Sequence, residues 1–92
     1  MSLDLKKNQA LDSFLSNLQL EKGLASNTIK AYANDCSAFI QWIYLKKKLD
    51  VIMASEDDIE SYLRHFQELG FSNSTINRKL SALKHFFLFL AK

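Results

Sequence analysis

The chain has 92 residues, enough for one small domain, and 48% of them are apolar and 24% charged. This composition is that of a globular protein and excludes a disordered one. The net charge of +2 indicates no partner by itself. No apolar run approaches the ~20 residues of a membrane span, and the amino terminus lacks the apolar core of a signal peptide. We therefore expect a cytoplasmic protein with no membrane partner.

The first half of the chain predicts two helices. The first covers about residues 8–22 and ends at Gly23, a residue type favoured just after a helix. The second covers about 26–47, begins at Ser26, an N-cap type, and ends in the lysine run 46–48, which suits the negative end of a helix dipole. Helical spacing places these apolar residues on the buried faces: Leu11, Phe14, Leu15, Leu18, Ile29, Ala33, Cys36, Phe39 or Ile40, and Ile43.

The second half predicts two more helices. Ser55 opens the third, about residues 55–69, and forms an imperfect capping box with Asp58, while Gly70 ends it. The fourth covers about 73–91. Its buried face is Ile76, Leu80, Leu83, Phe87 and Leu90. There is no strand-like alternation of any length, so the predicted fold class is all-α.

Two aromatic residues near the end of the chain lie beside this buried face. Phe86 and Phe89 fall toward its flank. Either they widen the core, or they stay partly exposed and make the domain self-associate. The sequence favours neither alternative.

A repeated phrase relates the two halves. "GLASNTIKAY" begins at Gly23 and "GFSNSTINRK" begins at Gly70, and the same offset pairs Phe39 with Phe86. A repeat of this kind indicates one supersecondary unit used twice. We therefore predict two helical hairpins, each with its second helix opening on the shared phrase.

Charge is distributed unevenly over the predicted helices. The third carries five acidic residues against Arg64, whereas residues 73–92 carry four basic residues and no acid. The second has Lys30 and the three lysines of 46–48 against Asp35. This asymmetry indicates an anionic partner for the second and fourth helices.

The exposed faces of these two helices carry hydrogen-bonding side chains of short or flexible reach, as contacts to phosphates and base edges require. "SNT" and "NST" at the helix starts add hydroxyls and amides to free backbone N–H groups. N-caps and a solvated face would explain either helix alone, but the pattern on both favours a functional surface. Its members are Lys30, Asn34, Ser37 and Gln41 on the second helix and Ser74, Asn77, Arg78, Ser81, Lys84 and His85 on the fourth.

Two motifs carry a resemblance to a known family. Ser26-Asn27-Thr28 with Tyr32 and Asp35 forms the first, and the Arg78-x-x-Ser81-x-x-Lys84 stretch before "FF" forms the second. Together, and over about residues 11–90, the chain resembles the N-terminal core-binding domain of tyrosine recombinases, which include phage integrases and Xer recombinases. Cys36 and Ala25 depart from the usual Leu and Ser of the pattern.

The resemblance implies a SAM-like four-helix bundle of two crossed hairpins that clamps one face of a double-stranded DNA recombination site. The implied partners are this DNA, a C-terminal catalytic domain of the same parent chain and neighbouring recombinase protomers. The implied DNA-binding residues are Ser26, Asn27, Thr28, Lys30, Ser74, Thr75, Arg78, Ser81 and Lys84, to which the polar faces add Asn34 and Asn77.

The family cleaves DNA with residues of the catalytic domain, which we expect to be absent from residues 1–92. We therefore expect this chain to bind DNA without cutting it, and we assign no catalytic role to Tyr32, Tyr44 or Tyr62. We predict no cofactor and no metal site, because the single cysteine has no ligand partners at suitable spacing. Whether Asp35 pairs with Arg78 to hold the hairpins together stays open.

Two alternatives remain. A helical protein–protein interaction module would have no need to keep acidic residues off the fourth helix. A free-standing helix-turn-helix repressor usually presents one recognition helix, whereas this chain offers two equivalent basic ones. The amino-acid sequence does not identify which DNA site the protein would recognise.

Overall fold

The computed structural model describes the backbone of residues 2–91 and the side chains of residues 9–91. Within this range the chain is helical and contains no strand, which confirms the all-α prediction. The helices are α1 (Ser2–Leu20), α2 (Ser26–Lys47), α3 (Glu56–Glu68) and α4 (Asn73–Leu90), with a 3₁₀ turn, η1 (Val51–Met53), between α2 and α3.

The first helix begins earlier than predicted. α1 starts at Ser2 rather than near Asn8, and it ends at Leu20 rather than at residue 22. The segment before Asn8 contains no glycine or proline that would stop a helix, so helical structure extends through it. The other three helices lie within one residue of their predicted bounds.

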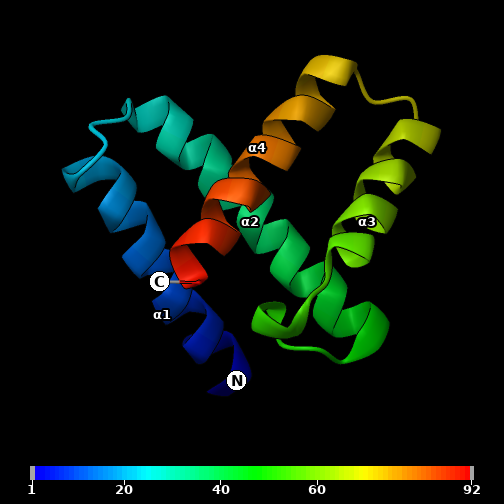
Figure 1. Cartoon of the computed structure of the whole chain (residues 1–92), viewed down its shortest axis with the longest axis horizontal. Coiled ribbons are helices and arrows are strands. Elements are labelled where there is room, and N and C mark those ends of the chain that lie inside the picture. The colour runs from blue at the N-terminus through cyan, green and yellow to red at the C-terminus, as the bar shows by residue number, and fades with distance from the viewer. Residues whose placement is uncertain (1, 92) are drawn as a thin grey trace.

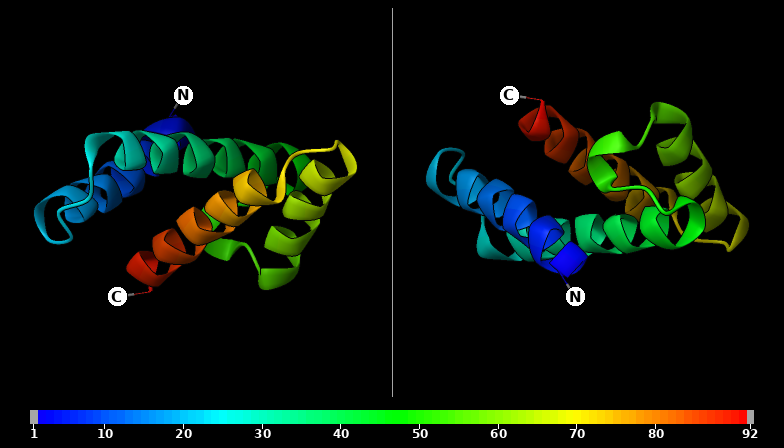
Figure 2. Two further views of the ribbon diagram at one scale, coloured as in Figure 1. Left: turned by 90° about the horizontal axis from the view of Figure 1, so that it is seen from above. Right: turned by 90° about the horizontal axis from the view of Figure 1, so that it is seen from below.

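The four helices form two crossed hairpins. α1 packs against α2, α3 packs against α4, and α2 crosses α4 at the centre of the molecule (Figure 1). Seen from above, α4 passes across one face of α2 rather than running alongside it (Figure 2). Both hairpin turns lie at the upper edge of Figure 1, and the connection through η1 lies at the lower edge.

Each hairpin turn uses a glycine with left-handed backbone. Gly23 has φ 63° and Gly70 has φ 89°, a conformation that other residues adopt only with strain. After α3 the turn is a complete Schellman motif, because the Phe71 amide donates to the Phe66 carbonyl and the Gly70 amide to the Gln67 carbonyl. The rings of Phe66 and Phe71 pack edge to face at 5.0 Å, which supplies the apolar contact of this motif.

The start of α2 differs from the prediction in its capping residue. The N-cap of α2 is Ala25, not Ser26, and it makes no side-chain cap. The equivalent residue of the second repeat, Ser72, caps α4 by accepting a hydrogen bond from the Thr75 amide at 3.2 Å. The predicted capping box of α3 is confirmed, since Ser55 and Asp58 bond to each other's backbone amides.

The core lies where the two hairpins cross. Phe14, Phe39 and Phe86 are fully buried, and the Phe14 and Phe86 rings are 5.2 Å apart. This corrects the predicted face of α4, because Phe86 is buried and Phe87 only half-buried. The contact of α4 with α1 turns its buried side by about one residue, and Phe89 also packs on Phe14. Self-association through an exposed Phe86 therefore has no structural basis.

The single cysteine occupies the core, as predicted. The Cys36 thiol is buried and donates to the Ala82 carbonyl across the crossing of α2 and α4 at 3.7 Å. Burial, with a further contribution from the neighbouring Asp35 carboxylate, raises the pKa of Cys36 to about 12. The residue acts as a small core side chain that brings the two helices close together.

An ionic contact joins the end of α2 to the start of α3. Lys47 donates to Asp58, whose side chain is 4% exposed and also accepts from the Ser55 amide. These bonds hold the pKa of Asp58 below its ordinary value, and the bond from Lys47 has the largest effect. The contact anchors the η1 connection at the lower edge of the molecule.

We predict that Ala25→Ser stabilises the protein by about 1 kcal/mol, because it supplies α2 with the cap that Ser72 gives α4. Ser72→Ala, the matched change in the second repeat, should cost about the same amount. Urea denaturation followed by circular dichroism measures both. A destabilising Ala25→Ser would show that the two turns are not equivalent.

The lowered pKa of Asp58 predicts an acid-sensitive contribution to stability. In the unfolded chain Asp58 takes up a proton at a higher pH than in the folded protein, so its stabilising effect is present above about pH 4 and is lost below it. The difference in unfolding free energy between the wild type and Asp58→Asn should therefore shrink as the pH falls from 6 toward 2. Lys47→Met should weaken this dependence. A difference that stays constant or grows in acid would contradict the assignment.

Candidate nucleic-acid interface

A buried carboxylate lies at the crossing of α2 and α4. The Asp35 side chain is 2% exposed. Arg78 contacts it through two parallel hydrogen bonds, from Nε to Oδ2 at 2.9 Å and from Nη2 to Oδ1 at 3.0 Å. Lys79 adds a third bond, from Nζ to Oδ1 at 3.2 Å. The question left open by the sequence is thus answered, because Asp35 does pair with Arg78 and connects the two hairpins.

Lys79 is the residue whose role the sequence analysis missed. Its side chain is 11% exposed, and its ammonium group lies 4.6 Å from the centre of the Phe66 ring on α3 while it bonds to Asp35 on α2. The sequence counted it only in the net positive charge of the fourth helix, and its burial means that this charge is not presented at the surface. The available signal was its helical spacing, since Lys79 lies on one face with Ile76, Ala82, Leu83 and Phe86.

Arg78 bonds to the buried Asp35 and is itself partly exposed to solvent. The hydrogen bonds to Asp35 raise its pKa, so the guanidinium stays charged. Asp35 engages two of its five N–H donors, and 45% of the side chain remains exposed. Arg78 can therefore hold the crossing and still present positive charge to a bound molecule.

A smaller polar cluster lies next to Arg78 on the same side of α4. The hydroxyls of Tyr32 and Ser81 share a hydrogen bond of 3.1 Å between α2 and α4. The Ser81 carbonyl accepts a hydrogen bond from Nδ1 of His85 at 2.8 Å, and the rings of Tyr32 and His85 are 5.8 Å apart. Ser81 is half-buried, so its hydroxyl helps to join the helices instead of standing free.

The structure places the two copies of the repeated phrase at the same edge of the molecule, apart from each other. The amino-terminal ends of α2 and α4 both lie at the upper edge of Figure 1, on either side of the crossing, whereas α2 ends at the lower edge. Thr28 and Thr75 are half-buried near these ends. Apart from the half-buried Ser81, the other predicted contact residues of the two phrases and their helices are exposed, namely Ser26, Asn27, Lys30, Asn34, Ser74, Asn77, Arg78 and Lys84.

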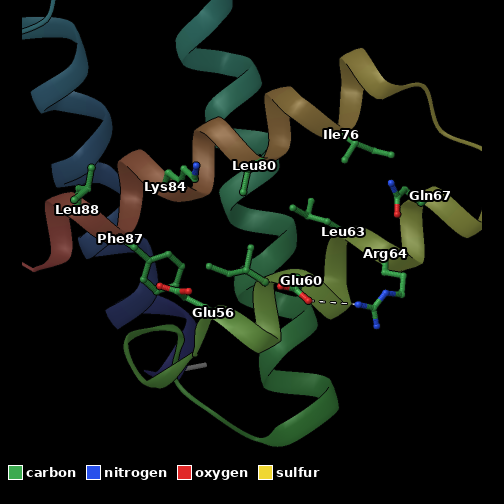
Figure 3. Close-up of a pocket in the computed structure, with 11 residues that line it drawn as sticks. Glu56, Glu60, Leu63, Arg64, Gln67, Ile76, Leu80, Lys84, Phe87 and Leu88 are labelled. Atoms are coloured by element: carbon green, nitrogen blue, oxygen red, sulfur yellow. Dashed lines mark hydrogen bonds and ion pairs between the residues drawn. The ribbon is translucent and has the colours of Figure 1, made fainter.

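Lys84 has different neighbours from the rest of this group. It lines a groove of about 940 Å³ between α3 and α4 (Figure 3). Leu63, Leu80 and Phe87 line the groove as well, and Glu56 and Glu60 contribute acid from α3. Lys84 therefore lies on the flank of α4 that faces α3 and not on the flank that faces α2.

Comparison with known proteins identifies the family. The sequence profile described as "Phage integrase, N-terminal SAM-like domain" matches residues 11–92. The chain belongs to this family. Its SAM-like bundle is thus the fold that the resemblance implied.

Curated relatives of this SAM-like domain are recombinases. "Tyrosine recombinase XerC" of Roseiflexus sp. (strain RS-1) is 35% identical over 90% of this chain and 26% of its own length. XerC of Herpetosiphon aurantiacus is 37% identical over 89% of the chain and 27% of the relative, and XerD of Yersinia pestis is 34% identical over 90% and 27%. The chain thus spans about a quarter of the relatives that it matches. No solved structure gives a significant match.

The three tyrosines discussed above are packed or hydrogen-bonded against neighbouring side chains of this SAM-like domain. Tyr62 is 2% exposed among aromatic rings, and burial, with smaller effects of Asp35 and Cys36, raises its pKa to about 12. Tyr44 is half-buried below the Lys48 ammonium group, and Tyr32 is bonded to Ser81.

Among the side chains from residue 9 to residue 91, no three His, Cys, Asp or Glu residues gather in a way that could hold a metal ion. No helix in the described range could cross a membrane.

The ionic contacts of Asp35 predict a large effect of its removal. Asp35→Ala should cost about 3 kcal/mol or more in unfolding free energy, because Lys79 would remain buried without a counter-charge. Asp12→Ala removes an exposed acid from α1 and should cost less than about 0.5 kcal/mol. Urea denaturation of both variants tests the comparison. Similar small losses would show that Asp35 is not essential to the crossing.

Proposed function

We propose that this domain binds double-stranded DNA as part of a site-specific tyrosine recombinase. It would clamp one face of the recombination site, while a C-terminal domain of the same parent chain cleaves and joins strands beside neighbouring protomers. Such work on DNA would place the protein in the cytoplasm. The observation that carries the proposal is the position of both repeated phrases, with their exposed donors, at one edge of the molecule.

Electrostatics favours a nucleic acid at this edge. Lys30 and Arg78 bring positive charge to α2 and α4, and the acids of α3 lie on a separate helix. The crossing itself carries a net positive charge, because the two positive charges of Arg78 and Lys79 outnumber the single negative charge of Asp35. Positive charge near the start of two helices suits a phosphate backbone, because the positive end of each helix dipole lies there as well.

The exposed residues divide into two kinds of contact. Lys30, Arg78 and Lys84 supply charge for phosphates, and Lys84 would reach the DNA only from the α3 flank of its helix. The short polar side chains Ser26, Asn27, Asn34, Ser74 and Asn77 suit phosphates and base edges. The half-buried Thr28, Thr75 and Ser81 would contribute mainly by placing their neighbours.

One observation favours a second candidate function. The groove between α3 and α4 has an apolar lining and both signs of charge at its rim, and Leu88 beside it is 68% exposed. A protein-interaction module would use such a surface. The groove and the DNA-facing edge involve different residues, with Lys84 as the exception, so variants can separate the two functions.

We predict weak and largely sequence-indifferent binding of this domain to duplex DNA, with steep salt dependence. Lys30→Gln with Lys84→Gln should lower the affinity by roughly 10- to 100-fold at about 0.1 M salt and reduce the salt slope by about two units. Arg78 is left intact because its loss would also disturb the crossing. Fluorescence anisotropy with a labelled duplex, measured over a range of salt concentrations, gives both quantities.

The matched control changes two other exposed lysines. Lys46→Gln with Lys48→Gln removes the same charge from the far end of α2 and spares Lys47, which bonds to Asp58. This variant should keep most of the affinity, and circular dichroism should show both proteins to be helical. Equal losses from the two pairs would mean that net charge alone governs binding. Wild-type binding that is independent of salt would contradict DNA as the partner.

A further inference from the structure

The imidazole of His85 is held in a defined orientation at the surface. The Ser81 carbonyl, one helical turn earlier, lies 2.8 Å from Nδ1. Because a carbonyl oxygen only accepts hydrogen bonds, Nδ1 must carry a proton in this contact. The other ring nitrogen, Nε2, is then an acceptor in the neutral ring and a donor in the protonated ring. His85 is exposed, and the Tyr32 ring beside it restricts its rotation.

His85 continues the row of donors on α4. Ser74, Arg78, Ser81 and His85 follow one another at intervals of four, three and four residues, which places them along one side of the helix. Arg78 and Ser81 on this row contact α2 at the crossing. A DNA strand that follows the row from the start of α4 would therefore reach His85 after Arg78.

The charged groups around His85 are mostly basic or already paired. The charged residues nearest to His85 along α4 are Lys84, on the flank that faces α3, and Arg78, which is bonded to Asp35. α3 packs on that other flank and brings Glu56 and Glu60 to the groove beside Lys84. From α2, Tyr32 is the titratable group that contacts the ring, and the Asp35 carboxylate is bonded to Arg78 and Lys79. α1 contacts α4 through the apolar ring of Phe14. No ion pair joins His85 to a carboxylate in the part of the chain that the structure describes.

We propose that His85 is a phosphate-contacting residue of the DNA-binding surface, engaging the backbone through Nε2 when the ring is protonated. This inference rests on the proposed function. The Ser81 carbonyl keeps Nδ1 occupied, so the added proton goes to Nε2, which then donates a charge-assisted hydrogen bond to a phosphate oxygen. Because Nε2 only accepts hydrogen bonds in the neutral ring and donates one in the protonated ring, the contact makes DNA affinity depend on pH.

The test compares duplex affinity at pH 5.5 and pH 8 by fluorescence anisotropy, over a range of salt concentrations. One added phosphate contact should increase the affinity about 8-fold at about 0.1 M salt and steepen the salt slope by about 0.9. His85→Gln should abolish both changes. His85→Arg, which keeps a charged donor at every pH, should bind about equally well at the two pH values and at least as tightly as the wild type at pH 8.

The chain provides a matched control in its second histidine. His65 is also exposed, but it lies on the acidic helix α3 against the Phe66 ring. His65→Gln should keep the full pH dependence. Circular dichroism at both pH values establishes that each variant is folded, so a loss of binding cannot come from unfolding.

The possible outcomes separate this inference from the proposed function. Binding that strengthens in acid and loses this response only in His85→Gln supports the contact. Salt-sensitive binding with no pH response, or with a response that persists in His85→Gln or vanishes in His65→Gln, overturns the role of His85 and leaves DNA binding intact. Failure of the wild type to bind duplex at either pH overturns both.

Discussion

The Asp35 carboxylate at the crossing of α2 and α4 is the contact on which the arrangement of the two hairpins depends. A buried charge is costly unless it is paired and hydrogen-bonded, and Asp35 meets this requirement through three bonds from Arg78 and Lys79. The bidentate geometry of the arginine is directional, so it fixes the register of one helix against the other as well as their proximity. Lys79 extends the contact to α3 through Phe66.

The two repeats differ where this contact forms, and their differences are complementary. In the repeat register, Asp35 corresponds to Ala82, while Arg78 and Lys79 correspond to Ala31 and Tyr32. The acid of the first hairpin thus meets the bases of the second, and the small Ala82 lets Cys36 approach its carbonyl. The pairing thus joins non-equivalent positions of the two repeats, and its counterpart in the opposite sense, Ala82 with Ala31, carries no charge, so the ion pair forms only once.

The same contact has a consequence for the proposed DNA-binding surface. The network at the crossing sets the distance and angle between the starts of α2 and α4, and therefore between the two sets of donors at the upper edge of Figure 1. Arg78 belongs to both the network and that surface. Donors held in place before binding lose little conformational freedom when they contact phosphates, which favours a binding surface built on rigid helices.

The sequence by itself determined the four helices, the two glycine turns and the repeat, because each depends on local features such as apolar spacing, capping residues and left-handed backbone. It also indicated the family and the residues of a basic, donor-rich surface. Only the tertiary structure decided that Lys79 is buried, that Phe86 rather than Phe87 faces the core and that Lys84 lines the groove beside α3. These outcomes depend on the angle at which α4 crosses its neighbours, and helical periodicity alone does not contain that angle.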